Sequence, residues 1–155
     1  MRRVFCGLAL CSLLLAALPA TSATGRVIKV LPEFLDLQGR SSLAPSLYER
    51  DAYQAMLREH PERRAGIRFY VQWKTKGPAW EPLKLRIELR GIAKGALPQS
   101  LVLEEPLENS GSRFAHWASA GLEGLTYKEF GGVTAWHVGL WEGKRLLSEQ
   151  KSFLW

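Results

Sequence analysis

The sequence predicts an all-β fold: an antiparallel two-sheet sandwich of about seven strands, with one inserted helix near residues 47–59. Residues 67–74 and 83–90 alternate apolar and polar side chains almost without exception, as strands with one buried and one solvent-exposed face do. Further short segments are separated by turns that contain glycine or proline, which is typical of sandwiches and barrels. A partly open barrel is the main alternative.

The N-terminal third of the chain contains one expected strand, one loop and the helix. Residues 27–31 form the strand, and apolar residues beyond Pro32 prolong it. Residues 38–45 are rich in glycine, serine and proline, which indicates a loop. Ser46 and Glu49 match a capping box, in which the two side chains satisfy free amides at a helix start. Apolar residues at helical spacing follow, so the helix is expected to lie on the sheet or to cap one end of it.

The middle of the chain supplies four expected strands. Residues 75–82 join the alternating segments 67–74 and 83–90 through a Gly-Pro turn signal, so we expect these strands to form a hairpin or to be neighbours. A shorter strand over 101–105 ends before a proline, and 114–120 is a further candidate.

The C-terminal part is expected to form a hairpin. Residues 124–131 break the alternation and end in two glycines, which predicts one helical turn or a tight corner. Residues 133–141 and 146–154 are strands joined by the turn 142–145. Aromatic residues at the end of the last strand indicate that it is held in the sheet.

This succession of short strands resembles the immunoglobulin and fibronectin type III folds in pattern only. The Cys…Trp…Cys framework of immunoglobulin domains is absent, because Cys6 and Cys11 both lie near the N-terminus. The remaining chain has no thiol, which excludes a disulfide, a cysteine nucleophile or a cysteine metal site there.

Residues 1–23 have the layout of a secretory signal peptide. Two arginines precede an apolar run, and small residues precede a cleavage site near Ala23. The run is shorter than the roughly 20 residues of a membrane span. Lipid anchoring at Cys11 is disfavoured, because a leucine occupies the preceding position and the apolar run continues past the cysteine. We expect a secreted or periplasmic protein with one domain over 24–155 and no integral membrane span after signal removal.

The charge balance argues against nucleic acid as a partner. The chain has 21 lysines and arginines against 15 acidic residues, a net charge of +6 that is spread along the sequence. Nucleic-acid-binding proteins concentrate their basic residues in a patch or stripe. The excess therefore predicts a solvated surface with weak attraction to anionic envelope components.

No catalytic motif is present. The sequence has no Gly-x-Ser-x-Gly elbow, His-Glu-x-x-His helix or glycine-rich phosphate loop. His116 and His137 lie on different predicted strands and could face each other, but two histidines are fewer ligands than zinc normally takes. We expect no enzyme, metal or cofactor. A small hydrolase using His116 or His137 remains an alternative, which requires a serine or carboxylate within hydrogen-bonding distance of the imidazole.

The six tryptophans are the main binding candidates. Trp80 lies in a loop between two prolines, where it is either a core plug or a ligand platform, and we favour the plug. Trp136 and Trp141 have opposite strand parity, so one of them faces outward. Trp80, together with whichever of Trp136 and Trp141 faces outward, would suit a carbohydrate.

Charged residues flank the loop before the helix. Asp36, Arg40, Arg50 and Asp51 are expected to form an ion network that holds the loop. Alternatively, Arg40 or Arg50 binds a carboxylate or phosphate in bidentate fashion.

These observations predict a non-catalytic binding protein of the envelope or extracellular space. A protein partner is the leading hypothesis, with strand addition at the last hairpin as one route. A glycan bound by exposed tryptophans is the alternative.

Overall fold

The structure is a computed structural model, and it describes residues 23–108 and 114–155. The predicted signal peptide and the question of lipidation at Cys11 concern residues 1–22, which lie outside the described residues. Both remain predictions.

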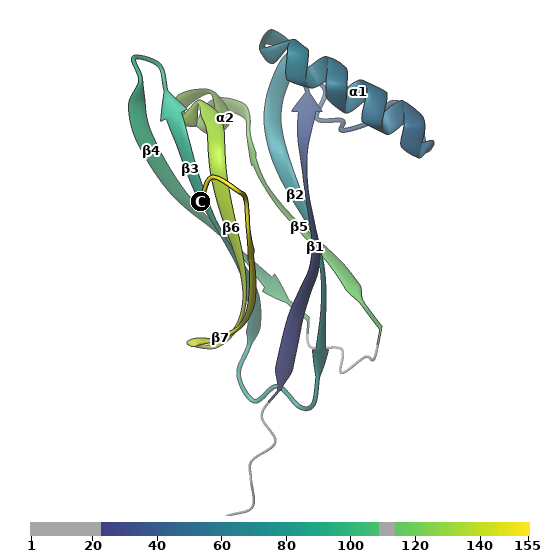
Figure 1. Cartoon of the computed structure of the whole chain (residues 1–155), viewed down its shortest axis with the longest axis vertical. Helices are drawn as coiled ribbons and strands as arrows, with labels where there is room; N and C mark the ends of the chain where they lie inside the picture. Colours follow the sequence, from purple (N-terminus) through teal and green to yellow (C-terminus); the bar gives the residue numbers. More distant parts are fainter. Residues whose placement is uncertain (1–22, 109–113) are drawn as a thin grey trace, which may run out of the picture.

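Seven strands in the described part form two antiparallel sheets (Figure 1), which confirms the predicted β-sandwich. Sheet A has the order β1-β2-β5 and sheet B the order β4-β3-β6-β7. The order matches the constant-type immunoglobulin arrangement, except that the fourth strand lies on the sheet of the third strand. The strands are β1 (Thr24–Asp36), β2 (Arg64–Lys76), β3 (Leu83–Ala93), β4 (Leu97–Leu107), β5 (His116–Glu123), β6 (Gly132–Glu142) and β7 (Arg145–Lys151).

The predicted hairpin of the two alternating strands is wrong, although their alternation is correct. β2 belongs to sheet A and β3 to sheet B, so the connector between them crosses from one sheet to the other. Their apolar faces meet in the core, where Phe69, Val71, Leu85 and Ile87 are completely buried in one cluster. Alternation specifies which face of a strand is buried, but it does not specify the neighbouring strand.

The helix α1 (Leu47–Glu59) has the predicted bounds, but it does not begin with a capping box. Ser46 is the N-cap residue and its side chain makes no capping hydrogen bond. Because Ser46 and Glu49 are both exposed, water can satisfy the free amides there instead. A short 3-10 helix, η1 (Pro61–Arg63), leads from α1 into β2.

A second helix, α2 (Gly124–Phe130), occupies the segment predicted as one turn or a corner. It ends at Gly131, whose φ of 81° favours glycine. A Cβ atom at Gly131 would overlap the carbonyl oxygen of Ile92. Phe130 is buried in the core, so α2 closes one end of the sandwich.

Two predicted strand ends are also wrong. β4 continues past Pro106 to Leu107, because a proline is tolerated on an edge strand when its nitrogen faces away from the ladder. β7 ends at Lys151, and Phe153 is fully exposed. Two hydrogen bonds between Ser152 and Trp136 hold the segment after β7 against the sheet. Trp155 adds a stacking contact with His137, with ring centroids 5.3 Å apart.

The terminal hairpin does not offer a free edge along its whole length. β1 lies beside β7, and the Val27 amide donates a hydrogen bond to Ser148 Oγ at 3.0 Å. Arg145 also donates to the carbonyl oxygen of Ala23 at 2.7 Å. β1 therefore lies against the N-terminal part of β7, the edge at which strand addition was predicted.

Candidate ligand-binding groove

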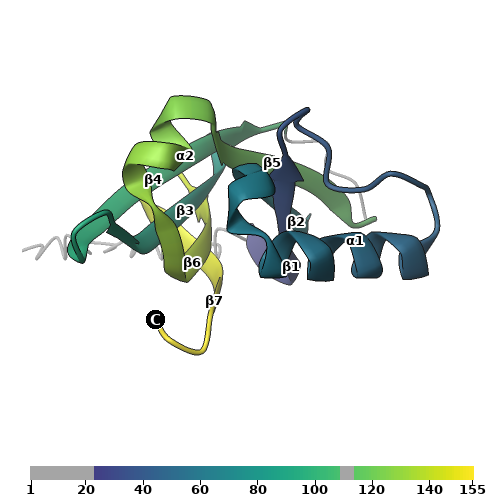
Figure 2. The ribbon, with the colours of Figure 1, turned by 90° about the horizontal axis from the view of Figure 1, so that it is seen from above.

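A groove of about 500 Å³ lies between α1 and the outer face of sheet A. Figures 1 and 2 show α1 lying across one end of this sheet, with half of the helix projecting beyond it. The floor contains Leu31 of β1, Tyr70 of β2 and Trp117 of β5. Leu31 is directly opposite Tyr70 in the ladder, and their parity places them on the face away from sheet B. Leu47 and Arg50 of α1 form the wall.

Buried leucines and the Gln54 side chain help to hold α1 against the sheet. Leu35 of β1 and Leu57 of α1 are both buried, and neither belongs to the main core cluster. The Gln54 side chain accepts from the Phe34 amide at 2.8 Å and donates to the Phe34 carbonyl oxygen at 2.9 Å. It also donates to the carbonyl oxygen of Ser41 at 2.7 Å. These bonds join the helix to β1 and to the loop that precedes it.

A buried carboxylate holds the loop before α1. Asp36 accepts hydrogen bonds from the amides of Gln38 and Arg40, from Arg40 Nε at 3.0 Å and from the Tyr53 hydroxyl at 2.7 Å. Burial by itself would raise the pKa of Asp36, but these bonds outweigh it and lower the pKa to about 2. Arg40 is thus engaged in the loop and does not line the groove.

The predicted four-residue network does not form, and only Asp36 and Arg40 of the four pair with each other. Asp36 pairs with Arg40, while Arg50 pairs with Glu33, a residue that the sequence did not single out. Asp51 is exposed and has no ion pair among the described residues. Arg50 and Asp51 are kept apart by the geometry of the helix, because the side chains of successive residues point about 100° apart around its axis.

Arg50 is the one predicted site residue that lines the groove. Its Nε lies 3.5 Å from Glu33 Oε1, and the carboxylate is nearly buried. In the described part of the chain, the two terminal guanidinium nitrogens of Arg50 have no hydrogen-bond partner. They can therefore donate a pair of charge-assisted hydrogen bonds to a bound carboxylate or phosphate.

Sequence reasoning missed the aromatic floor. Trp117 is 52% exposed, which is unusual for a large aromatic side chain in a strand. The available signal was Tyr70, an aromatic residue on the polar face of an alternating strand whose other outward residues are charged or amide side chains.

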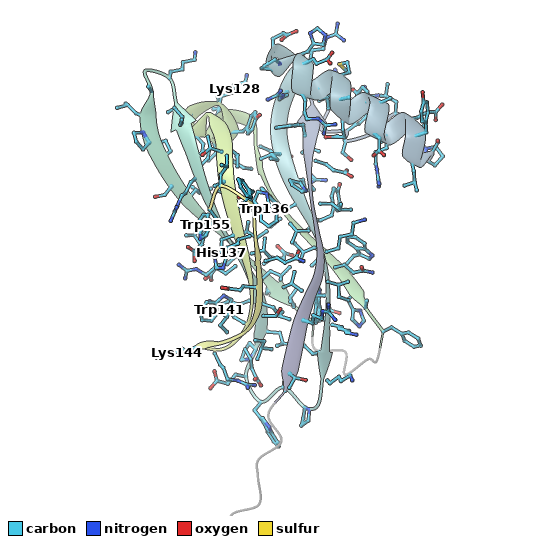
Figure 3. The ribbon with its side chains drawn as sticks, in the orientation of Figure 1. Lys128, Trp136, His137, Trp141, Lys144 and Trp155 are labelled. Carbon is cyan, nitrogen blue, oxygen red and sulfur yellow. The ribbon has the colours of Figure 1, made fainter. Side chains whose placement is uncertain are left out.

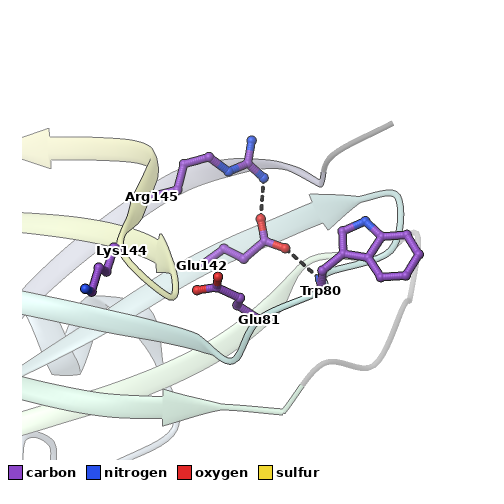
Figure 4. A pocket seen from close by; sticks show the side chains of 5 residues that line it. All are labelled: Trp80, Glu81, Glu142, Lys144 and Arg145. Atoms are coloured by element: carbon purple, nitrogen blue, oxygen red, sulfur yellow. Dashed lines mark hydrogen bonds and ion pairs between the residues drawn. The ribbon is translucent and has the colours of Figure 1, made fainter. Parts of the chain in front are cut away.

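Trp80 marks a second hollow of about 730 Å³, shown in Figure 4. The side chain is 76% exposed, so the predicted core plug is wrong. The Trp80 amide donates to Glu142 Oε1 at 2.7 Å, and the other oxygen of Glu142 accepts from Arg145. Both hydrogen bonds lower the pKa of Glu142, and the bond from Arg145 has the larger effect. Glu142 thereby fixes the backbone of the loop in a conformation that leaves the Trp80 side chain exposed to solvent.

Trp136 and Trp141 lie on opposite faces of β6, as their parity predicted (Figure 3). Trp136 faces the core and packs edge-on against Phe69, with ring centroids 6.2 Å apart. Trp141 lines a shallow hollow on the outer face of sheet B, beside Lys144. Since Lys144 also lines the hollow of Trp80, the fold brings Trp80 and Trp141 to the two sides of one turn.

The two histidines are in different sheets and do not face each other. The His116 ring packs against Trp73 of sheet A at an interplanar angle of 36°. His137 of sheet B lies 2.8 Å from Glu149. The carboxylate that a histidine hydrolase needs is thus within reach of His137, on the open outer face and beside Trp155. No group of three or more possible metal ligands occurs among the described residues.

The described residues include no helix that is both long and apolar enough to cross a membrane. Comparison with known proteins finds no matching family model, curated protein or solved structure.

Proposed function

We propose that the protein is an exported, non-catalytic β-sandwich that acts as a protein-interaction module of the envelope or extracellular space. The groove beneath α1 is its binding site in this proposal. One observation carries it: an arginine with free terminal nitrogens borders a half-exposed aromatic and aliphatic floor.

The groove suits a segment of a protein partner that combines an apolar side chain with a carboxylate. Leu31, Leu47 and Trp117 offer apolar contact, which is the usual centre of a protein interface. The lining has two basic residues, Lys29 and Arg50, and one acidic residue, Glu33, so its net charge is positive. The volume lies within the roughly 300–1,000 Å³ range of small-ligand sites, which admits a few side chains rather than a folded domain.

We expect acidic peptides to bind more tightly than their amide counterparts. The probes are eight-residue peptides in which one Asp or Glu neighbours Leu or Phe, compared with the same peptides carrying Asn or Gln. Arg50→Gln should weaken the acidic peptides about tenfold, because a charge-assisted pair is lost. Trp117→Ala should weaken both sets. Tryptophan fluorescence titration measures the wild type and Arg50→Gln, and calorimetry measures all variants.

Arg58→Gln is the matched control, because Arg58 is an exposed arginine on the same helix that does not line the groove. Equal binding of acidic and amide peptides would contradict the proposal, as would equal weakening by Arg58→Gln. Thermal unfolding of Arg50→Gln separates lost binding from the effect of leaving Glu33 without its partner.

A second candidate function is carbohydrate binding at Trp80. The exposed indole on an anchored loop favours it, and Trp141 lies beyond the same turn. Aromatic faces stack on sugar rings, while Glu81 and Lys144 offer hydrogen bonds at the rim.

Trp80→Ala is expected to change the free energy of unfolding by less than about 1 kcal/mol, because the side chain is in solvent. If glycans bind here, the same variant abolishes the fluorescence response to a panel of neutral and anionic oligosaccharides. Trp117→Ala is the control and should keep the response. A loss of about 3 kcal/mol would instead indicate a buried plug.

A further inference from the structure

β4 forms one edge of sheet B, and its outer side has no strand partner in the described part of the chain. Figure 1 shows it at the margin of the sandwich, on the side away from α1. The strand is eleven residues long and pairs with β3 without a bulge. Val102 near its middle is 46% exposed.

The hydrogen bonds of β6 show which backbone groups of β4 face outward. The amide and carbonyl groups of Trp136 both bond to Ser152, so they point away from β3. In an antiparallel ladder, a residue and the one directly opposite either both bond across that ladder or both point away. Leu89 lies opposite Trp136, so its backbone amide and carbonyl groups point toward β4, where Leu101 is its partner.

The even-numbered residues of β4 must then direct their amide and carbonyl groups to the free edge, because neighbouring residues alternate in direction. The two prolines of the strand, Pro98 and Pro106, are both even-numbered. Neither costs a bond to β3, as expected for prolines on an edge strand. Between them, Ser100, Val102 and Glu104 direct their amides to the outer side, where the described residues supply no strand partner.

The sequence of β4, LPQSLVLEEPL, has nearly the same pattern of residue types in both directions about Val102. An antiparallel second copy centred there places Ser100 opposite Glu104 and Gln99 opposite Glu105. Leu101 lies opposite Leu103, and the end leucines also meet. No like charges are directly opposite, and about six backbone hydrogen bonds form between the two pairs of prolines.

Other registers are less favourable. A shift by two residues in one direction places Pro98 opposite Glu104, and in the other direction it places Pro106 opposite Ser100. Either way a proline occupies a position that needs a donor. A shift by four residues places Glu104 opposite its own copy, where like charges repel. Leu101 and Leu103 already pack against the core. When the pairing is centred on Val102, these leucines continue the apolar layer from one copy to the other.

We propose that β4 is a self-association surface, on which a second copy of this chain pairs antiparallel with a two-fold axis at Val102. The interface is isologous and closes on itself. The prolines end the ladder on both sides, which restricts pairing to this register and prevents longer edge-to-edge contacts. The proposal is independent of the groove beneath α1, which lies on the other sheet.

Cysteine cross-linking tests the register. The test uses the full chain with Cys6 and Cys11 replaced by serine, so that an introduced cysteine is the only thiol. Val102→Cys should form a disulfide-linked dimer under mild oxidation, because directly opposite hydrogen-bonded residues have Cα atoms about 5.5 Å apart. Ser100→Cys alone should not cross-link, whereas a mixture of Ser100→Cys and Glu104→Cys chains should give mixed dimers.

Analytical ultracentrifugation tests the association itself. The wild type should show a concentration-dependent dimer, and Val102→Pro should be monomeric with an unchanged unfolding midpoint, since its amide makes no bond to β3. Leu103→Pro, which removes a bond within the sheet, should lower the midpoint. A wild type that stays monomeric at the highest concentration would overturn the proposal, as would equal cross-linking of Ser100→Cys and Val102→Cys. Either result assigns the free edge to a different partner.

Discussion

Leu57→Ala is expected to lower the free energy of unfolding by about 2–5 kcal/mol, the range for removing a buried leucine side chain. Leu57 is completely buried between α1 and the outer face of sheet A, away from the main core. The helix has few other apolar attachments to the sheet, because its exposed residues include Leu47 and Tyr48. The variant should therefore loosen α1 and remove one wall of the groove. Chemical denaturation and hydrogen exchange of the α1 amides measure the two effects.

Leu47→Ala is the matched control on the same helix. Leu47 is 66% exposed, so its removal should change the free energy of unfolding by no more than about 0.5 kcal/mol while it weakens peptide binding in the groove. If Leu57→Ala cost less than about 1 kcal/mol, α1 would owe its position to Gln54 and the Asp36 loop instead.

Asp36→Asn is expected to cost about 2 kcal/mol at neutral pH. The folded-state pKa of Asp36 is about 2, against an ordinary value of 3.8, and this difference corresponds to roughly that free energy. Because the folded pKa is the lower one, the stabilisation is fully present above pH 3.8. It is lost as the pH falls toward 2. The difference between wild type and variant should therefore shrink over this interval, which denaturation curves at several pH values measure.

Asp51→Asn is the control for the pH series, because Asp51 is an exposed acid without an ion pair in the described residues. Its unfolding curves should follow those of the wild type at every pH. A constant difference between wild type and Asp36→Asn down to pH 2 would show that the carboxylate is not held by the amides of Gln38 and Arg40. Tyr53→Phe removes one of the hydrogen bonds to the Asp36 carboxylate. In that background, Asp36→Asn should therefore lower the free energy of unfolding by less than it does in the wild type.

The strands could be read from the sequence because each is a local pattern. The alternation of Phe69 and Val71 with polar residues identifies the buried face of β2 without reference to any other strand. The pairing of β2 could not be read in this way. Its partners are β1 and β5, which are distant along the chain from one another, and the turn that leads to β3 crosses between sheets.

The binding residues were only partly accessible to the same reasoning. Arg50 was a candidate because it lies near other charges, and Trp80 because prolines flank it. The exposed state of Trp80 depends on Glu142, which is 62 residues further along the chain. Trp117 becomes part of a groove only when β5 lies beside β2 and α1 projects over both.

Local patterns along the chain are enough to predict the fold class, about seven strands, the bounds of α1 and the buried face of each central strand. These properties arise from side-chain chemistry repeated at the spacing of a strand or helix, and neighbouring residues are enough to specify them. Contacts in the folded molecule specify which strands are neighbours, that Arg50 lies beside an aromatic floor, and which sheet edge has no strand partner in the described part of the chain. Each of these depends on contacts between segments far apart in the chain, which no local pattern encodes.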